Sequence, residues 1–435
     1  MTLATPFLTL LDRRADVKGS RDPLGVQQIW SRLGRTVVSN LTTVTTSVAD
    51  FAILVLGCHF AAALAETSGQ SLVDVFLKWE QIAAYARFGA GDRGFRGIDT
   101  VREHCEVKPL SVVPLGAGGD AQLLANQKSY GIWGLYSVAA RSSGLVDPEA
   151  RLTAVGERLA ALLLARLTPL QIREIEQLLV SATKLDRSGQ AVLLSAIADV
   201  FLRLAADQRA LLRHHLAYGG DEPSADDPGR FERQRLFADQ LQLFADDDWE
   251  LKAATLASIA ARVGDTTQAA GRDVATALHR ICTAESVLAP AAELFDFALG
   301  ADGSRIDDVA ACVTERWGAA LRTSIDLDAV AALRTEFFTG PTDRAESEPR
   351  WQAIAIALRE ARYRDALLAL IAHNATVMNA RGGAAWILLK DDMTLDVRFR
   401  DVSGAELTAG ADLPDLWRNA YFIEALRTIV RALKD

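Results

Sequence analysis

The segment that most constrains the fold of this chain is residues 123–165, where helix and turn signals follow one another in a fixed order. An aromatic helix is expected over residues 124–137, and Gly144 with the two apolar residues after it is typical of a helix end. A short extended link follows, and Thr153 with Gly156 marks the start of a second apolar helix. Helix, stop, extended link and helix in this order predict a winged-helix unit, in which one helix can enter a major groove.

Length and composition predict a mainly α-helical protein. The 435 residues are enough for two to four domains, and aromatic residues make up only 7%, which favours helices over sheets. The four cysteines are widely spaced and are expected to be reduced thiols of a cytoplasmic protein. No secretory signal is expected at the N-terminus. The apolar run 51–65 is shorter than the ~20 residues of a membrane span, so we expect a buried helix and no membrane partner.

Three domains are expected along the chain. Residues 1–165 form a helical domain that contains the winged-helix-like unit. Residues 166–372 form a helical-bundle body, with a linker rich in Gly, Pro and Asp near residues 219–229. Residues 373–435 form a small α+β cap, with a β-hairpin over residues 385–400 and a final helix over residues 413–433.

The charge is distributed unevenly. The net charge is −9, but residues 1–165 carry 16 basic and 15 acidic side chains, so the acidic excess lies in the rest of the chain. An acidic body argues against non-specific DNA binding, which depends on neutralising phosphates. A first basic cluster, which could also be a solvated helix face and loop, comprises Arg13, Arg14, Lys18, Arg21, Arg32 and Arg35.

The winged-helix-like unit supplies a second set of candidate DNA contacts. Amide and basic side chains can read base edges or hold phosphates. In this unit they are Asn126, Gln127, Lys128, Arg141 and Arg151. The predicted wing, however, carries Asp147 and Glu149, although a wing that faces phosphate is usually basic. Binding of a protein partner is therefore an equal alternative for this unit.

One pattern would indicate an enzyme. Asp99 followed by Glu106 and Lys108 resembles the Asp…Glu-x-Lys core of metal-dependent restriction-type nucleases, in which two carboxylates hold Mg²⁺ and the lysine assists the attacking water. That core needs its Glu-x-Lys on a strand, and helices are expected around this one. The Cys and His spacings indicate no metal site, and the glycine loops lack a phosphate-binding motif, so no cofactor is expected.

The N-terminal third resembles proteins of bacterial antiphage defence islands. The resemblance covers about residues 19–145 and depends on Gly-Ser-Arg-Asp-Pro-Leu-Gly at 19–25, the Thr/Ser-rich segment 41–47 and the helix that contains Phe51. It implies a role beside the ATPases, helicases or nucleases of a defence system, and it implies no catalytic residues. The sequence thus predicts a DNA-sensing or adaptor subunit without catalysis of its own. The alternatives are a metal-dependent nuclease and a purely protein-binding helical scaffold.

Overall fold

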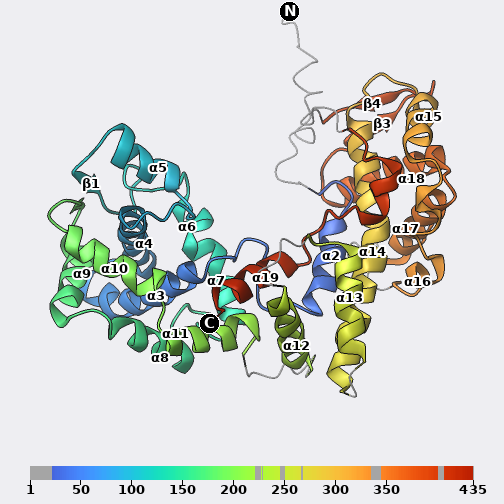
Figure 1. Ribbon diagram of the computed structural model, residues 1–435. Helices are drawn as coiled ribbons and strands as arrows, with labels where there is room; N and C mark the ends of the chain where they lie inside the picture. The colour runs from blue at the N-terminus through green and yellow to red at the C-terminus, as the bar shows by residue number, and fades with distance from the viewer. Residues whose placement is uncertain are drawn as a thin grey trace, which may run out of the picture. The chain divides into compact units, whose positions relative to one another are not determined.

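The structure, a computed structural model, describes residues 22–220, 227, 229–244, 250–265, 268–334, 344–399 and 406–434. This part of the chain is mainly α-helical, as the composition predicts (Figure 1). It forms two compact units: unit 1 comprises Met1–Val37 and Asp248–Tyr421, and unit 2 comprises Val38–Asp247 and Phe422–Asp435. This division differs from the three expected domains, because each unit combines segments that are distant in sequence.

Unit 2 is a helical assembly with one small strand pair. Its elements are α3 (Val48–Ser68), α4 (Leu72–Gly89), α5 (Ile98–Arg102), the π-turn η1 (Glu103–Val107), β1 (Val112–Pro114), α6 (Gln127–Tyr130), α7 (Ile132–Ser142), α8 (Ala154–Leu164), α9 (Pro169–Ser181), β2 (Lys184–Asp186), α10 (Ala191–Leu202), α11 (Ala206–Leu212), η2 (Arg213–Ala217), α12 (Arg230–Leu243) and α19 (Ile423–Ala432). Strands β1 and β2 pair antiparallel. The predicted linker near 219–229 falls between η2 and α12, inside this unit, and residues 221–226 and 228 lie outside the described residues.

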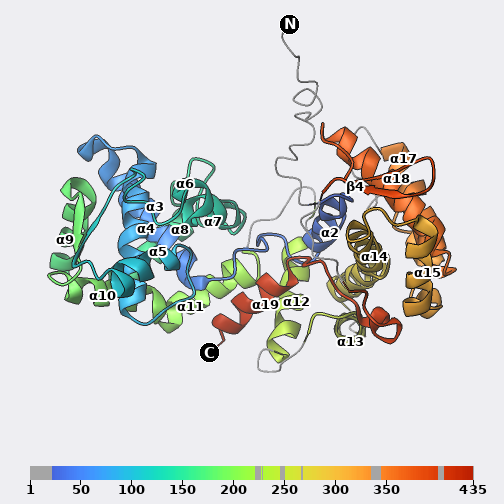
Figure 2. The same ribbon diagram turned by 90° about the horizontal axis from the view of Figure 1, so that it is seen from above.

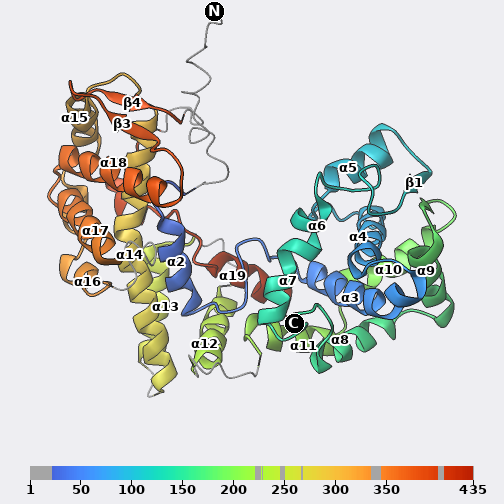
Figure 3. The ribbon, with the colours of Figure 1, turned by 180° about the vertical axis from the view of Figure 1, so that it is seen from behind.

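Helix α3 is the core helix of unit 2. The side chain of Ser47 caps it by accepting a 3.1 Å hydrogen bond from the backbone N–H of Asp50. It packs against α4, α7, α8, α9 and α10 (Figure 3). A Cβ at Gly57 would lie 2.5 Å from the ring of Phe76, so glycine is what allows α3 and α4 to approach this closely.

The apolar run 51–65 was expected to form a helix too short to cross a membrane, and this prediction of the helix length was wrong. Helix α3 has 21 residues, because it extends by about one turn in each direction beyond the apolar run 51–65. Among the described residues it is the one helix long and apolar enough to span a membrane. However, 72% of its most apolar window is buried inside the structure, as in the core helix of a globular unit.

The helix expected over residues 124–137 is divided into α6 and α7 at Gly131. The Glu80 carboxylate accepts a 2.7 Å hydrogen bond from the backbone N–H of Ile132 and so caps α7. A Cβ at position 131 would lie 2.5 Å from the same carboxylate oxygen, so only glycine fits this break. After α7, Val146 and Leu152 form an antiparallel β-bridge, and α8 begins directly after it.

Unit 1 is built around the long helix α14. Its elements are α2 (Val26–Arg35), α13 (Ala253–Gly264), α14 (Ala269–Leu299), α15 (Ile306–Trp317), η3 (Ala320–Arg322), α16 (Leu327–Ala331), α17 (Arg344–Arg359), α18 (Tyr363–Ala380), β3 (Ile387–Leu389), β4 (Leu395–Val397) and η4 (Gly410–Asp415). Helix α13 lies alongside α14, and α2 and α15 lie on opposite sides of α14 (Figure 2). The described N-terminal residues are held in this unit by α18, because His373 and Asn374 contact the carbonyl oxygens of Leu24 and Pro23 at 2.9 Å each.

The C-terminal region is not one α+β cap. Strands β3 and β4 pair antiparallel where a hairpin is expected, and they belong to unit 1. The expected helix over residues 413–433 instead begins at Ile423, and it belongs to unit 2. The residues before it form η4 and then an extended segment, because Glu285 of α14 accepts hydrogen bonds from the backbone N–H groups of Arg418 and Asn419.

Candidate functional site

The nuclease pattern does not form the arrangement that its chemistry requires. Glu106 lies in the π-turn η1 and Lys108 directly follows it, whereas the motif needs a strand. All three side chains form exposed ion pairs with other residues: Asp99 with Arg102 at 2.6 Å, Glu106 with Arg93 at 3.5 Å and Lys108 with Glu103 at 2.7 Å. Within the described residues, no group of three His, Cys, Asp or Glu side chains could hold a metal ion.

The first basic cluster is divided by the architecture. Arg13, Arg14, Lys18 and Arg21 lie outside the described residues. Arg32 and Arg35 lie in the last turn of α2, where a positive charge interacts favourably with the helix dipole. Helix α2 belongs to unit 1, whereas all candidate contacts of the winged-helix-like segment belong to unit 2, so neither unit by itself contains the whole predicted set.

In the winged-helix-like segment, four of the five predicted contacts are exposed. They are Asn126, Lys128, Arg141 and Arg151. The fifth, Gln127, is fully buried, and its amide group donates to the Glu80 carboxylate at 2.9 Å and to the carbonyl oxygen of Leu77 at 3.2 Å. Its amide oxygen accepts from Gln81 at 3.2 Å, so this side chain joins α6 to α4 and is not available to DNA.

A buried polar network joins helices α3 and α4 of unit 2. Arg87 of α4 forms an ion pair with Asp50 of α3 and a second one with Asp92 at 2.6 Å. The Arg87 and Asp50 side chains are 4% and 7% exposed. The adjacent cavity has a volume of about 10 Å³, which is room for one water molecule and not for a substrate. The network therefore holds α3 and α4 together.

Glu80 makes the stability of unit 2 sensitive to pH. Burial raises the pKa of this carboxyl from 4.5 to about 7, although hydrogen bonds from Ile132 and Gln127 oppose the shift. Between these two values the folded protein holds a proton that the unfolded chain has lost, so stability falls as the pH rises. We expect the free energy of unfolding of wild type, relative to Glu80→Gln, to fall by roughly 2–3 kcal/mol from pH 4.5 to 7.5.

Hydrogen exchange of the α3 and α4 amide groups at several pH values measures this difference. The matched control is Glu66→Gln, because Glu66 is an exposed glutamate on α3. The free energy of unfolding of Glu66→Gln should change with pH in the same way as that of wild type over this range. If the curves of wild type and Glu80→Gln are also parallel, Glu80 does not titrate in this window.

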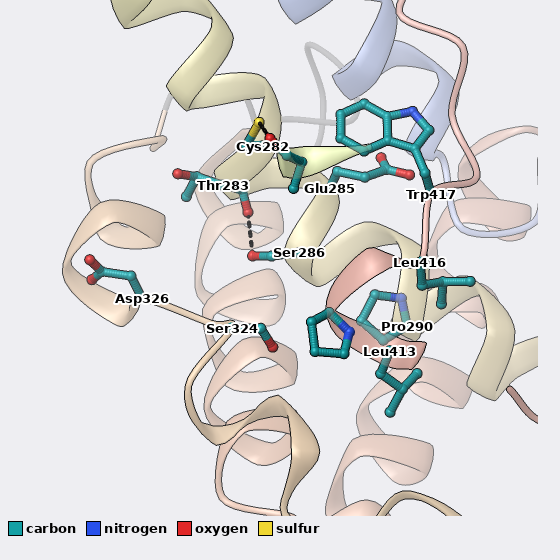
Figure 4. A pocket seen from close by; sticks show the side chains of 12 residues that line it. Cys282, Thr283, Glu285, Ser286, Pro290, Ser324, Asp326, Leu413, Leu416 and Trp417 are labelled. Atoms are coloured by element: carbon teal, nitrogen blue, oxygen red, sulfur yellow. Dashed lines mark hydrogen bonds between the residues drawn. The ribbon is translucent and has the colours of Figure 1, made fainter. Parts of the chain in front are cut away.

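Unit 1 contains a pocket of about 290 Å³ between α14 and the segment 406–421, which we call the strap. Thr283, Ser286 and Pro290 of α14 form one wall, and Ser324 and Asp326 lie opposite (Figure 4). The strap lines one side of the pocket with apolar side chains, and Trp417 lies beside Glu285. The volume lies at the lower end of the range of small-molecule sites.

Two buried glutamates of α14 hold the strap in place. Glu285 accepts four hydrogen bonds from it: from the backbone N–H of Arg418 at 2.6 Å and of Asn419 at 3.0 Å, from the Asn419 amide at 2.9 Å and from the Tyr421 hydroxyl at 2.7 Å. Glu293 accepts from the backbone N–H of Thr408 at 2.6 Å and from its hydroxyl at 2.9 Å. The strap is thereby fixed on both sides of the segment that covers the pocket.

The pocket carries no activated nucleophile. Burial and the neighbouring Glu285 raise the pKa of the Cys282 thiol to about 12, so this group is uncharged at neutral pH. Burial also raises the pKa of Glu285, although all four hydrogen bonds from the strap lower it. Since these bonds occupy both carboxylate oxygens, Glu285 positions the strap. Neither Cys282 nor Glu285 is thus arranged to act as a nucleophile.

The sequence contains one local signal of this pocket. Pro290 interrupts a long helical pattern, and a proline inside a helix leaves the carbonyl of the fourth residue before it without its regular donor. The contribution of Trp417 has no such local signal, because Trp417 and Pro290 are distant in sequence and Trp417 falls within the expected helix 413–433.

Searches against family models, curated proteins and solved structures find no match to this chain. The architecture alone gives the class of the protein, which is a mainly α-helical protein of two units, each with its own core.

Proposed function

We propose that this protein is a non-catalytic adaptor subunit of a bacterial antiphage defence complex, and that it acts in the cytoplasm. The resemblance of residues 19–145 to defence-island proteins supports the setting. We also propose that α7, the bridge between Val146 and Leu152, and α8 form a winged-helix-like unit that binds a protein partner. An ATPase, helicase or nuclease of the same system is the expected partner.

The observation that carries the proposal is the composition of the exposed α6–α7 face. Tyr130 at the end of α6 is 60% exposed, and Val138 of α7 is 53% exposed. Gly134, Val138 and Arg141 share one side of α7 by helical spacing. Helix α6 lies close to this side, because a Cβ at Gly134 would lie 2.2 Å from the carbonyl oxygen of Ser129. Exposed aromatic and apolar side chains among polar ones are typical of protein interfaces.

The charge on this face also favours a protein over DNA. Lys128, Arg141 and Arg151 are exposed, but the turn between the bridge residues carries Asp147 and Glu149. Asp147 accepts a 2.8 Å hydrogen bond from the backbone N–H of Arg151, which fixes a carboxylate within the turn. A nearly balanced charge releases few counterions from DNA. The three exposed basic residues support DNA sensing as the second candidate.

The proposal predicts that one substitution at an exposed position weakens partner binding. In co-expression with the products of neighbouring genes, Val138→Glu should weaken association with the partner at least tenfold relative to wild type. The matched control is Val192→Glu on α10, because Val192 is 81% exposed in the same unit but lies outside this face. Equal retention by the two variants contradicts the proposal.

DNA binding is tested separately with the full chain and a 30-base-pair duplex at two salt concentrations. The adaptor proposal expects no retardation at low salt. Binding that decreases steeply with salt, and that is lost when Lys128, Arg141 and Arg151 are replaced by alanine, would favour the DNA-sensing candidate instead.

A further inference from the structure

We propose that the pocket between α14 and the strap binds a small, flat organic cation of the amidinium or guanidinium type. The pocket is lined by unit 1 residues, and the proposal is independent of the proposed adaptor function. It depends on three properties of the pocket: the sign of its charge, its hydrogen-bond acceptors and its aromatic wall.

The charge of the pocket excludes anions. Among the described residues that line it, none is Lys, Arg or His, whereas Glu285 and Asp326 are acidic. The nearby basic side chain of Arg418 forms an ion pair with Asp296 and does not line the pocket. A phosphate or carboxylate ligand would therefore meet negative charge without a compensating donor.

The polar wall offers acceptors. Asp326 caps α16: its Oδ1 accepts from the backbone N–H groups of Asp328 at 3.0 Å and Ala329 at 3.1 Å. No described residue donates to its second oxygen, and Asp326 is an exposed residue at the edge of the pocket, so this carboxylate retains an acceptor there. The nearby hydroxyl of Ser324 is the donor in a 3.4 Å contact with the carbonyl oxygen of Leu321, so its lone pairs also remain as acceptors.

A backbone acceptor lies on the α14 wall. Pro290 has no N–H, so the Ser286 carbonyl lacks the donor that residue 290 would supply in a regular helix. A carbonyl in a helix points along the axis toward the fourth residue after it, and both Ser286 and Pro290 line the pocket. The hydroxyl of Ser286 donates to the carbonyl oxygen of Thr283 at 2.8 Å, which leaves its oxygen as a further acceptor.

The aromatic wall suits a flat cation. Trp417 is held in position, because its indole N–H donates to the carbonyl oxygen of Asn419 at 2.6 Å and its ring lies 5.6 Å from that of Tyr421 in a T-shaped arrangement. Indole faces attract cations, and prolines and leucines provide the remaining apolar surface. A ligand with several N–H donors on a flat, charged group satisfies the acceptors and the ring together.

The test compares three probes of the same shape and different charge: benzamidine, benzamide and benzoate. Binding to the full chain is followed by the indole N–H signal of Trp417 in ¹H–¹⁵N spectra, assigned with Trp417→Phe. Benzamidine should shift this signal in a saturable way, benzamide should bind at least tenfold more weakly, and benzoate should leave it unchanged. Equal binding of benzoate and benzamidine, or no shift with benzamidine, overturns the proposal.

A variant pair locates the charge. Asp326→Asn should weaken benzamidine binding about tenfold, and it should leave thermal unfolding unchanged, because asparagine caps a helix as well as aspartate does. Asp328→Asn is the control, since Asp328 is exposed on the same helix and does not line the pocket. Equal affinity of wild type and Asp326→Asn overturns the assignment of Asp326, and with it the proposal.

Discussion

Arg87→Met is expected to lower the free energy of unfolding of unit 2 by about 3–5 kcal/mol, because it leaves a carboxylate buried without its partner. Asp50 lies in the first turn of α3 and its side chain is only 7% exposed, so bulk water solvates the unpaired carboxylate poorly. Methionine fills much of the volume of arginine, so the loss reports charge more than packing. Hydrogen exchange of the amide groups in α3 and α4 measures the change in unit 2 alone.

The control is Arg102→Met, which removes an exposed pair in the same unit. The Arg102 and Asp99 side chains are 53% and 84% exposed, and such pairs contribute at most about 1 kcal/mol. Adding Asp50→Asn to Arg87→Met should recover part of the loss, because the buried charge is then removed as well. A loss below 1 kcal/mol for Arg87→Met would show that water or other side chains compensate Asp50.

The helical nature of the chain could be predicted because it depends on local properties. Serine and threonine caps, apolar periodicity and Ala/Leu content are written in short stretches of sequence, and the start of α8 after Thr153 shows this directly. The β-hairpin near the C-terminus follows the same rule, because its two strands are neighbours along the chain.

The division into units could not be predicted, because it depends on contacts between distant segments. Residues 22–37 pack into unit 1 through α14 and α18, and the last helix packs into unit 2 against α12 and η2. A pattern along the chain carries no signal of which helix is the partner. The linker near residues 219–229 shows the same limit, because its Gly/Pro/Asp-rich composition does not say which unit its two sides belong to. There Gln234 of α12 reaches back to donate to Asn40 at 2.8 Å, so both sides of the stretch belong to one unit.

The candidate site shows the same limit at the level of single residues. Gln127 has the side-chain type of a base-reading residue, and its burial against Glu80 becomes evident only from the packing of α6 on α4. Residues 413–421 of the strap fall within the expected helix 413–433, on which Trp417 and Tyr421 would lie one turn apart. In the structure the Glu285 carboxylate accepts hydrogen bonds from the backbone N–H groups of residues 418 and 419. Glu285 lies more than 130 positions earlier in the sequence. A tertiary hydrogen bond of this kind overrides local propensity.

The strap depends on this carboxylate, and Glu285→Ala should therefore release it. The substitution removes the acceptor of four hydrogen bonds, including that of Tyr421, which is fully buried. Buried donors without an acceptor cost about 1–3 kcal/mol each, and water can reach some of them once the strap moves. We expect a loss of about 3–5 kcal/mol in the free energy of unfolding of unit 1, and faster hydrogen exchange over residues 406–421 than in the rest of this unit.

Glu285→Gln separates the carboxylate from the packing of the side chain. The glutamine oxygen can still accept from the backbone N–H groups of residues 418 and 419, but its amide group faces the donating amide of Asn419. An intermediate loss, of about 1–2 kcal/mol, is the expected result. Glu315→Ala on α15, an exposed position of unit 1, serves as the control and should be neutral. Exchange over the strap that is as slow in Glu285→Ala as in Glu315→Ala would mean that the apolar contacts of Leu413 and Trp417, and not Glu285, hold the strap on α14.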